Sequence, residues 1–166
     1  AAVEKSIKET TLYADGEYPV MLSAQEQFDT RITVTKNKSF EAAMDLCKKY
    51  PDKKIAVHNF ASATNPGGGV VNGSRAQEEC LCRCSTLYPV LNTNMLWGGF
   101  YGFHRSRHDV LYTDTCIYSP GILIIKTDSE LPKRLPKEEW CQVDVITCAA
   151  PNLRANPYNK MNPGSG

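Results

Sequence analysis

The chain has 166 residues, 42% of them hydrophobic, which is enough to form one domain around a buried core. Its 19 lysine and arginine residues nearly balance 18 aspartate and glutamate residues, and the net charge of +1 predicts no direct binding of nucleic acid or of an anionic membrane. No run approaches the ~20 apolar residues that span a bilayer, and the N-terminal residues form no apolar signal region. We therefore expect a single soluble domain over residues 1–166, located in the cytoplasm.

The early part of the chain predicts a strand and a helix. Residues 1–14 could form a helix that ends at Asp15 and Gly16, although its apolar pattern is thin. Residues 31–35 (RITVT) alternate and are rich in β-branched side chains, which predicts a strand. Ser39 then caps a helix over residues 39–50 whose apolar positions recur at helical spacing: Phe40, Ala43, Met44, Cys47 and Tyr50.

A strand and a second helix flank a run of three glycines. Residues 54–60 (KIAVHNF) are short and apolar, as expected of a buried parallel strand. Ser74 is a good N-cap with Gln77 three residues later, which predicts a helix from Ser74 to about Leu87, ended by Pro89. This helix would bury Cys80, Cys84, Leu87 and Tyr88 along one side.

The cysteines do not indicate a disulfide framework. There are seven of them, an odd number, in a chain with no secretory signal region. Cys80, Cys82 and Cys84 resemble a metal motif, but on a helix Cys82 points away from the other two, and no second ligand pair is suitably spaced. Reduced thiols packed in the core are the favoured interpretation, and we expect no metal and no other cofactor.

The stretch between strand and helix, residues 65–79 (NPGGGVVNGSRAQEE), is the best candidate for a functional site. Three consecutive glycines can leave backbone N–H groups open to a phosphate or a sugar, and ligands bind at the carboxyl ends of strands in open α/β sheets. Glu78 and Glu79 then fall in the first turns of the helix, beside the loop. A nucleotide-phosphate loop is the competing hypothesis, but neither Gly-Lys-Ser/Thr nor Gly-x-Gly-x-x-Gly is present.

The remainder of the chain contains further strands and an aromatic segment. Residues 93–108 combine aromatic, glycine, histidine and arginine residues in a predicted loop, which either covers a ligand or packs its aromatic rings on the domain. Residues 111–118 and 122–125 predict two strands joined by a turn at residues 119–121, and residues 143–148 predict another buried strand. Residues 154–166 predict an unpacked tail. With two firm helices for about five strands, sheet faces would remain uncovered, so we expect the domain to be incomplete at its C-terminal end.

The motifs together resemble one family, the microbial-type poly(ADP-ribose) glycohydrolase catalytic domain. The resemblance depends on the glycine triplet followed, after seven residues, by Gln77-Glu78-Glu79. Its further matches are the sequences HNFASAT at residues 58–64, YTD at 112–114, IYSP at 117–120 and AAPN at 149–152. It implies an α/β fold of three layers, a macrodomain-like mixed sheet flanked by helices.

The same resemblance implies hydrolysis of the O-glycosidic ribose bond in poly- or mono-ADP-ribosyl groups, with ADP-ribose or ADP-ribosylated protein as substrate and no metal. Glu79 would be the catalytic acid and base, and Glu78 would hold ribose hydroxyls. The implied substrate-binding residues are Asn65, Gly67, Gly68, Gly69, Val70 and Gln77. The implied family also has a later glycine-rich loop around the pyrophosphate and an aromatic side chain on the adenine, and the chain contains no such segment.

Two alternatives to this interpretation remain open. Glu79 and Arg83 stand four residues apart, so an exposed helical salt bridge would explain Glu79 without any chemistry. A non-catalytic ADP-ribose-binding module, or an inactive fragment, could retain the glycine loop. An acid role also requires that burial or the charge of Glu78 outweigh the helix dipole, which favours ionised Glu79.

Overall fold

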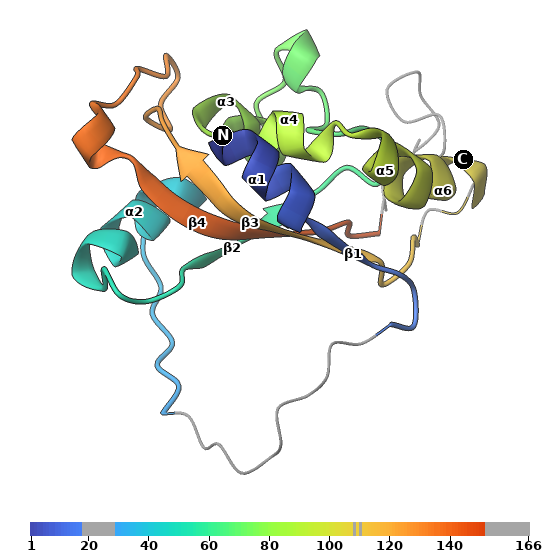
Figure 1. The fold of residues 1–166 in the computed structure, drawn as a ribbon, viewed down its shortest axis with the longest axis horizontal. Helices are drawn as coiled ribbons and strands as arrows, with labels where there is room; N and C mark the ends of the chain where they lie inside the picture. Colours follow the sequence, from blue (N-terminus) through green and yellow to red (C-terminus); the bar gives the residue numbers. More distant parts are fainter. Residues whose placement is uncertain (18–28, 108, 110, 152–166) are drawn as a thin grey trace.

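The computed structural model describes residues 1–17, 29–107, 109 and 111–151. It contains a four-stranded mixed sheet in the order β1-β3-β4-β2 (Figure 1). The strands are β1 (Thr11–Tyr13), β2 (Ala56–Phe60), β3 (Cys116–Ile124) and β4 (Cys141–Cys148). β3 pairs antiparallel with both β1 and β4, whereas β2 pairs parallel with β4. The mixed α/β class that the sequence predicts is therefore confirmed.

One helix precedes β1, and the other described helices lie in the connections between the strands. The α-helices are α1 (Ala2–Glu9), α2 (Ser39–Lys49), α3 (Gln77–Cys84), α4 (Leu87–Leu91), α5 (Asn94–Leu96) and α6 (Gly102–Arg107). The 3₁₀ turns η1 (Val70–Asn72) and η3 (Lys137–Glu139) and the π-helix η2 (Trp97–Tyr101) complete the set. In the part of the chain that the structure describes, no helix has the length and apolar character needed to cross a membrane.

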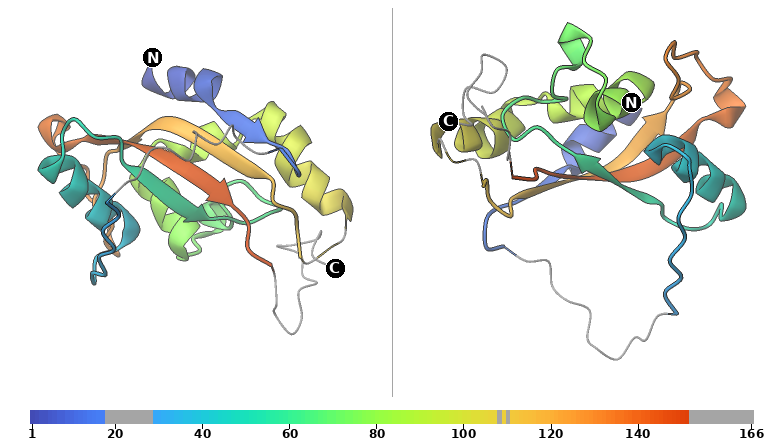
Figure 2. Two further views of the ribbon diagram at one scale, coloured as in Figure 1. Left: turned by 90° about the horizontal axis from the view of Figure 1, so that it is seen from below. Right: turned by 180° about the vertical axis from the view of Figure 1, so that it is seen from behind.

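The core lies between one face of the sheet and the helices. Along β4, Val143, Val145 and Thr147 are buried, and they alternate with more exposed residues, as a sheet with one covered face requires. In Figure 1, α1, α3 and α4 lie above the sheet, and Figure 2 includes the view from below. On the opposite face Phe60 is 61% exposed and Ile146 36% exposed. The described residues thus supply the sheet and one layer of helices, and the uncovered face agrees with the sequence prediction.

The predicted strand at residues 31–35 is wrong. The segment is irregular, and Ile32 and Val34 are 88% and 92% exposed. Alternating β-branched residues favour an extended backbone, but a strand also needs a hydrogen-bonding neighbour, and no described strand pairs with this segment. At the N-terminus, the segment with the thin apolar pattern forms a helix that ends at Glu9 and is followed by the short strand β1.

The second predicted helix begins later than expected and is divided in two. α3 begins at Gln77 with Ala76 as N-cap, so the Ser74 capping box does not form. The shift also changes the buried face, because Cys82 and Cys84 are buried while Cys80 is half-buried. Pro89 lies inside α4 rather than ending a helix. This is compatible with the first turn of a helix, where a backbone N–H has no intrahelical acceptor.

The predicted turn at residues 119–121 is instead a bulge within one long strand. β3 continues through it, and its register with β4 shifts between Ser119 and Ile122. Gly121 adopts a positive φ of 73°, and its N–H donates to Asp144 Oδ1 at 3.1 Å. Glycine and proline in this stretch therefore mark one extra residue in the strand, not a hairpin.

The predicted aromatic loop is helical. The described residues from Asn94 to Arg107 form α5, η2 and α6 in direct succession. Phe100, Tyr101 and His104 are almost fully buried, and the rings of the first two meet edge to face at 5.0 Å. The packing interpretation of these aromatic residues is thus confirmed. His108, Asn152 and the predicted tail at residues 154–166 lie outside the described residues.

Candidate active site

The glycine loop begins where β2 ends and turns tightly on itself. Ser62 Oγ accepts hydrogen bonds from the backbone N–H groups of Thr64 and Asn65, at 3.3 and 3.1 Å. Gly68 N then donates to Asn65 O at 3.0 Å, which closes a turn around Pro66. Val70 N donates to Gly67 O at 3.1 Å and continues the chain into η1. The loop therefore has a defined shape set by its own hydrogen bonds.

The glycines allow two carboxylates to approach the backbone. Gly67 and Gly68 have positive φ values of 65° and 58°. A Cβ atom on Gly68 would lie 2.5 Å from Glu79 Oε1 and 3.1 Å from Glu78 Oε2. Residues with side chains neither adopt this backbone readily nor leave room for these oxygens. Gly68 is thus the point at which the loop and both carboxylates meet.

The backbone N–H groups of the loop are directed inward, which corrects the expectation of an open anion cradle. Gly69 N donates to Glu79 Oε1 at 2.8 Å. Gly67 N contributes a backbone hydrogen bond to Glu78. Since Gly68 and Val70 donate within the loop, all four N–H groups from Gly67 to Val70 are used. Three glycines suggest an anion site from sequence, but here they hold the protein's own carboxylates.

Glu78 is buried, with 3% of its surface exposed, and it is well bonded. Its Oε2 accepts from Ser62 N at 2.7 Å and its Oε1 accepts from Asn59 Nδ2 at 3.3 Å. The pKa of Glu78 is raised from 4.5 to about 7. Desolvation by burial is the largest cause and the charge of Glu79 adds to it, while the hydrogen bonds from Ser62, Asn59 and Gly67 oppose the rise. Glu78 is therefore the carboxyl whose pKa the fold brings close to neutrality.

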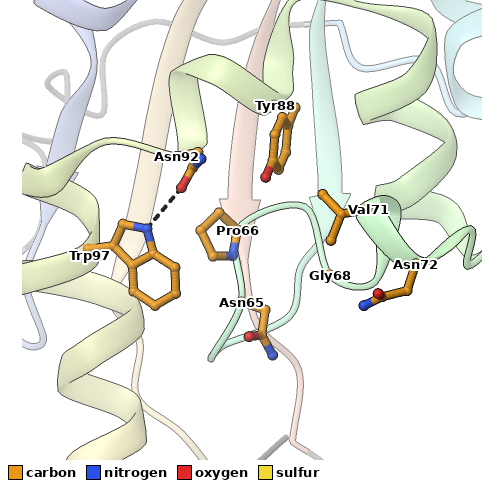
Figure 3. Close-up of a pocket in the computed structure, with 8 residues that line it drawn as sticks. All are labelled: Asn65, Pro66, Gly68, Val71, Asn72, Tyr88, Asn92 and Trp97. Carbon is orange, nitrogen blue, oxygen red and sulfur yellow. Dashed lines mark hydrogen bonds between the residues drawn. The ribbon is translucent and has the colours of Figure 1, made fainter. Parts of the chain in front are cut away.

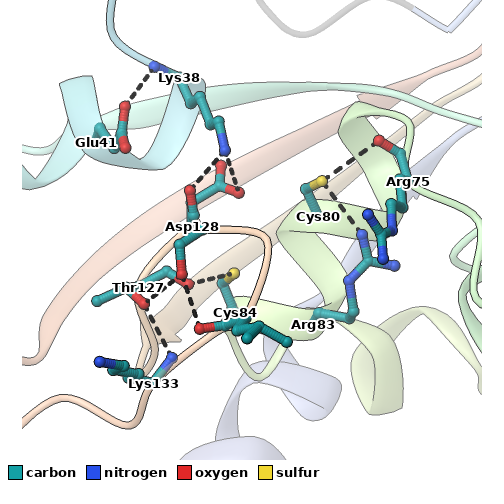
Figure 4. Close-up of polar contacts among 11 residues, drawn as sticks. Lys38, Glu41, Arg75, Cys80, Arg83, Cys84, Thr127, Asp128 and Lys133 are labelled. Carbon is teal, nitrogen blue, oxygen red and sulfur yellow. Dashed lines mark hydrogen bonds and ion pairs between the residues drawn. The ribbon is translucent and has the colours of Figure 1, made fainter.

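Glu79 is also buried, but its two oxygens differ. Oε1 accepts the hydrogen bond from Gly69 N, whereas Oε2 is buried and has no hydrogen-bond partner among the described residues. A buried carboxylate oxygen without a partner is costly unless a ligand satisfies it. The exposed salt bridge to Arg83 is not formed. Arg83 instead donates to Ser74 O. It also donates to Cys80 Sγ (Figure 4).

Gln77 joins the loop-helix unit to the rest of the fold. Its Oε1 accepts from Phe60 N at 2.9 Å, and its Nε2 donates to His58 O at 2.8 Å and to Ser39 Oγ at 3.2 Å. The side chain thus pairs with the free edge of β2 and with the first residue of α2. These contacts give Gln77 an anchoring position, and sequence spacing alone did not reveal it.

Two further groups near the carboxylates were not assigned from sequence. Asn59 Nδ2 also donates to Thr147 Oγ1 at 3.2 Å, which ties the partner of Glu78 to the adjacent strand β4. The Tyr101 hydroxyl is buried without a hydrogen-bond partner among the described residues. Burial raises the pKa of Tyr101, and the charge of Glu78 adds to that rise, so the phenol lies in the electrostatic field of the site.

Arg105 of α6 holds the outer side of the loop through two hydrogen bonds, which we call the Arg105 clamp. Arg105 Nε donates to Thr64 O at 2.7 Å, and its Nη2 donates to Asn65 Oδ1. The guanidinium lies 5.0 Å from the centre of the Trp97 ring, and Trp97 Nε1 donates to Asn92 Oδ1 at 2.9 Å. Arg105 is 40 residues from Asn65 in sequence, so no local spacing could have predicted this contact.

A pocket of about 180 Å³ opens beside the loop and the Trp97 ring (Figure 3). Its lining residues are Asn65, Pro66, Gly68, Val71, Asn72, Tyr88, Asn92 and Trp97. Gly68 lines this pocket, and a Cβ atom on Gly68 would lie within 3.1 Å of oxygens of both Glu78 and Glu79. Among the described residues no cluster of histidine, cysteine, aspartate or glutamate side chains is arranged to bind a metal.

Comparison with known protein families identifies this arrangement. The family model described as "Microbial-type PARG, catalytic domain" matches residues 1–127, about three quarters of the chain. The chain belongs to this family. In this chain the fold brings Glu78 and Glu79 together at Gly68 of the glycine triplet. A comparison with curated proteins finds no significant match.

Solved structures of bacterial poly(ADP-ribose) glycohydrolases, abbreviated PARG, have the same fold. The Thermomonospora curvata enzyme is 37% identical with a TM-score of 0.81, over 95% of this chain and 56% of that one. Its structure with the inhibitor ADP-HPD is 38% identical with a TM-score of 0.78, over 93% and 54%. The Deinococcus radiodurans enzyme in complex with ADP-ribose is 33% identical with a TM-score of 0.74, over 93% and 59%. This PARG-family chain thus spans little more than half the length of these relatives.

Proposed function

We propose that the chain carries the catalytic carboxylates of a poly(ADP-ribose) glycohydrolase, which hydrolyses the O-glycosidic ribose bond and releases ADP-ribose. The observation that carries this proposal is the buried Glu78–Glu79 pair at Gly68, with Glu79 Oε2 left without a described partner. Support comes from the family and from the related Deinococcus radiodurans structure, which is a complex with ADP-ribose.

Glu79 is the proposed acid and base. Its Oε1 accepts from Gly69 N, so the buried Oε2, which has no described partner, is the oxygen that we assign to the bound sugar. In the proposed reaction Glu79 gives a proton to the leaving oxygen as the C–O bond breaks and positive charge develops on the ribose ring. It then takes a proton from the water that attacks the anomeric carbon. The two steps leave Glu79 unchanged.

Glu78 has a supporting role in this scheme. Its hydrogen bonds fix the turn at Ser62, and its Oε2 edge faces Gly68, where it can accept a bond from a ribose hydroxyl. Its pKa of about 7 means that it is partly protonated near neutral pH. This limits the negative charge that accumulates beside Glu79. Asn65 and the backbone of Gly67 to Val70 would shape the sugar site, and Gln77 would hold it in place.

The test compares Glu79→Gln with the exposed control Glu139→Gln. Each protein is incubated with poly(ADP-ribosyl)ated protein while ADP-ribose release is followed, and ADP-ribose binding is measured by calorimetry. We expect Glu79→Gln to lose release while its dissociation constant for ADP-ribose stays within about threefold of the wild type, because glutamine can still accept from Gly69 N.

Three results would count against the proposal in different ways. Wild-type release by Glu79→Gln would remove this residue from the mechanism. ADP-ribose binding without release by the unmodified chain would favour the binding-module hypothesis. If the chain neither binds ADP-ribose nor releases it, the chain by itself is insufficient for the proposed function.

A further inference from the structure

Cys116 and Cys148 form a cross-strand pair that the glycosidase chemistry does not use. They are directly opposite each other in the antiparallel pairing of β3 and β4. Opposed residues in such a pairing have Cβ atoms about 4.5–5.5 Å apart and Cα atoms about 4.5–5.5 Å apart, the latter within the range that a disulfide bridges. Both side chains are half-buried, whereas their neighbours Ile117 and Thr147 are fully buried on the helix-covered face. The two thiols therefore lie together on the open face of the sheet.

The surroundings distinguish the two sulfur atoms. The thiol of Cys116 hydrogen-bonds to Cys148, and this bond, followed by the charge and hydrogen bond of His58, lowers the pKa of Cys148. The same contact, together with burial, raises the pKa of Cys116. His58 is on β2, the strand next to β4. Cys148 is thus the better nucleophile, and Cys116 is the adjacent thiol that can react with it.

Both thiols are partly exposed, and Cys116 lines a cavity. A cavity of about 350 Å³ reaches Cys116 on the open face, bordered by Tyr13, Asp114, Tyr118 and Ile146, among others. Cys82 and Cys84 of α3 differ in this respect, because both are buried and burial raises the pKa of both. A small oxidant can therefore reach the Cys116–Cys148 pair more easily than Cys82 or Cys84.

We propose that Cys116 and Cys148 are a reversible oxidation site, which a peroxide converts to a cross-strand disulfide. The Cys148 thiolate attacks one peroxide oxygen, the O–O bond breaks, and the other oxygen leaves as hydroxide and takes up a proton to become water. Cys148 is then a sulfenic acid. The sulfur of Cys116 attacks that of Cys148, the S–O bond breaks, and the departing hydroxide takes the Cys116 proton as a second water. Two thiols lose two electrons, and one peroxide is reduced.

Cys47 and Cys141 provide an internal comparison. Their side chains also contact each other, but burial and that contact raise the pKa of Cys141 to about 12, and no histidine lowers it. A thiol that is protonated at neutral pH reacts slowly with peroxide. The second pair should therefore be oxidised after the first.

The experiment treats the chain at pH 7 with increasing hydrogen peroxide, blocks the remaining thiols with N-ethylmaleimide and maps the peptides by mass spectrometry. We expect the first product to lose two of the seven thiols, linked as Cys116–Cys148, and to recover them with dithiothreitol. Cys116→Ala should stop at a sulfenic acid on Cys148 that dimedone traps. Cys47→Ala should form the link at the wild-type rate.

His58 supplies an independent readout. Its side chain is exposed, so His58→Gln should fold normally. We expect this variant to form the link about tenfold more slowly, because Cys148 would lose the interaction with His58 that lowers its pKa, and with it part of its thiolate population. The proposal is wrong if Cys47 and Cys141 form a disulfide first. It is also wrong if Cys148 remains fully labelled by N-ethylmaleimide while other thiols are oxidised, or if Cys148 becomes a sulfinic acid without linking to Cys116.

Discussion

Replacement of Gly68 by alanine tests whether the glycine loop exists to hold the carboxylates. Gly68 has φ +58°, and an added Cβ would lie 2.5 Å from Glu79 Oε1. Gly73 is a matched control, because its φ is +79° but an added Cβ would meet nothing within 4 Å. Both variants pay the cost of a left-handed alanine, about 1–2 kcal/mol. Only Gly68→Ala must also displace a carboxylate.

The size of that displacement can be worked from the contact. An oxygen at 2.5 Å must retreat by about 1 Å to reach ordinary van der Waals separation. The retreat stretches the bond from Gly69 N, now 2.8 Å, and a hydrogen bond to a charged group is worth about 1.5–3 kcal/mol. We expect a loss in the free energy of unfolding of about 1–2 kcal/mol for Gly73→Ala and about 3–5 kcal/mol for Gly68→Ala.

The assay pairs urea denaturation with the rate of ADP-ribose release. A misplacement of about 1 Å at the reacting group can cost about 100-fold in rate, so Gly68→Ala should lose at least that much while Gly73→Ala keeps most of its activity. Equal losses of stability and activity in the two variants would refute the reasoning, because backbone strain alone would then explain the requirement for glycine.

Three further variants test the surroundings of the site. The pKa of Glu78 is about 7 in the folded protein, against an ordinary value of 4.5 in the unfolded chain. The protonated carboxyl therefore stabilises the fold fully below pH 4.5, and this contribution is lost as pH rises through 7. Wild type should lose up to about 3 kcal/mol over this range, and Glu78→Gln should flatten that dependence in denaturation curves. Arg105→Lys should weaken ADP-ribose binding about tenfold, because lysine cannot donate to Thr64 O and Asn65 Oδ1 at the same time. An unchanged dissociation constant in calorimetry would show that the Arg105 hydrogen bonds do not support ligand binding. Tyr101→Phe should leave the melting temperature unchanged or higher, since it removes a hydroxyl without a described partner; a loss of about 1 kcal/mol or more would reveal a partner.

The local motifs were readable in the sequence because their signals are local. The helix over residues 39–50 follows a clear apolar period, and α2 covers Ser39–Lys49. The apolar runs that become β2 and β4 were also predicted, and they pair in parallel. The glycine triplet and the spaced Gln-Glu-Glu located the site and indicated the family. The roles of individual residues within the site stay predictions.

The rest depended on contacts between distant parts of the chain. Ser74 satisfies the N-cap rule, but its carbonyl accepts from Arg83 and its N–H donates to Gly69 O, so the helix starts three residues later. Gln77 is used by β2 and α2 instead of by a capping box. The aromatic segment lacks a clean helical period because a π-helix shifts its side chains by one position. Arg105 and Asn65 are 40 residues apart, so no local sequence pattern could predict their hydrogen bond.

The order of strands also has a consequence for how the protein is made. β4 lies between β3 and β2, yet it is the last described strand in the chain. Asn59, which donates to Glu78, needs Thr147 of β4, 88 residues later. A growing chain therefore exposes an unpaired β2 edge, and Asn59 lacks its β4 partner, until the central strand has emerged. The hydrogen bonds between the glycine loop and the carboxylates are local and can form first, whereas the link from Glu78 through Asn59 to β4 forms only when the central strand inserts.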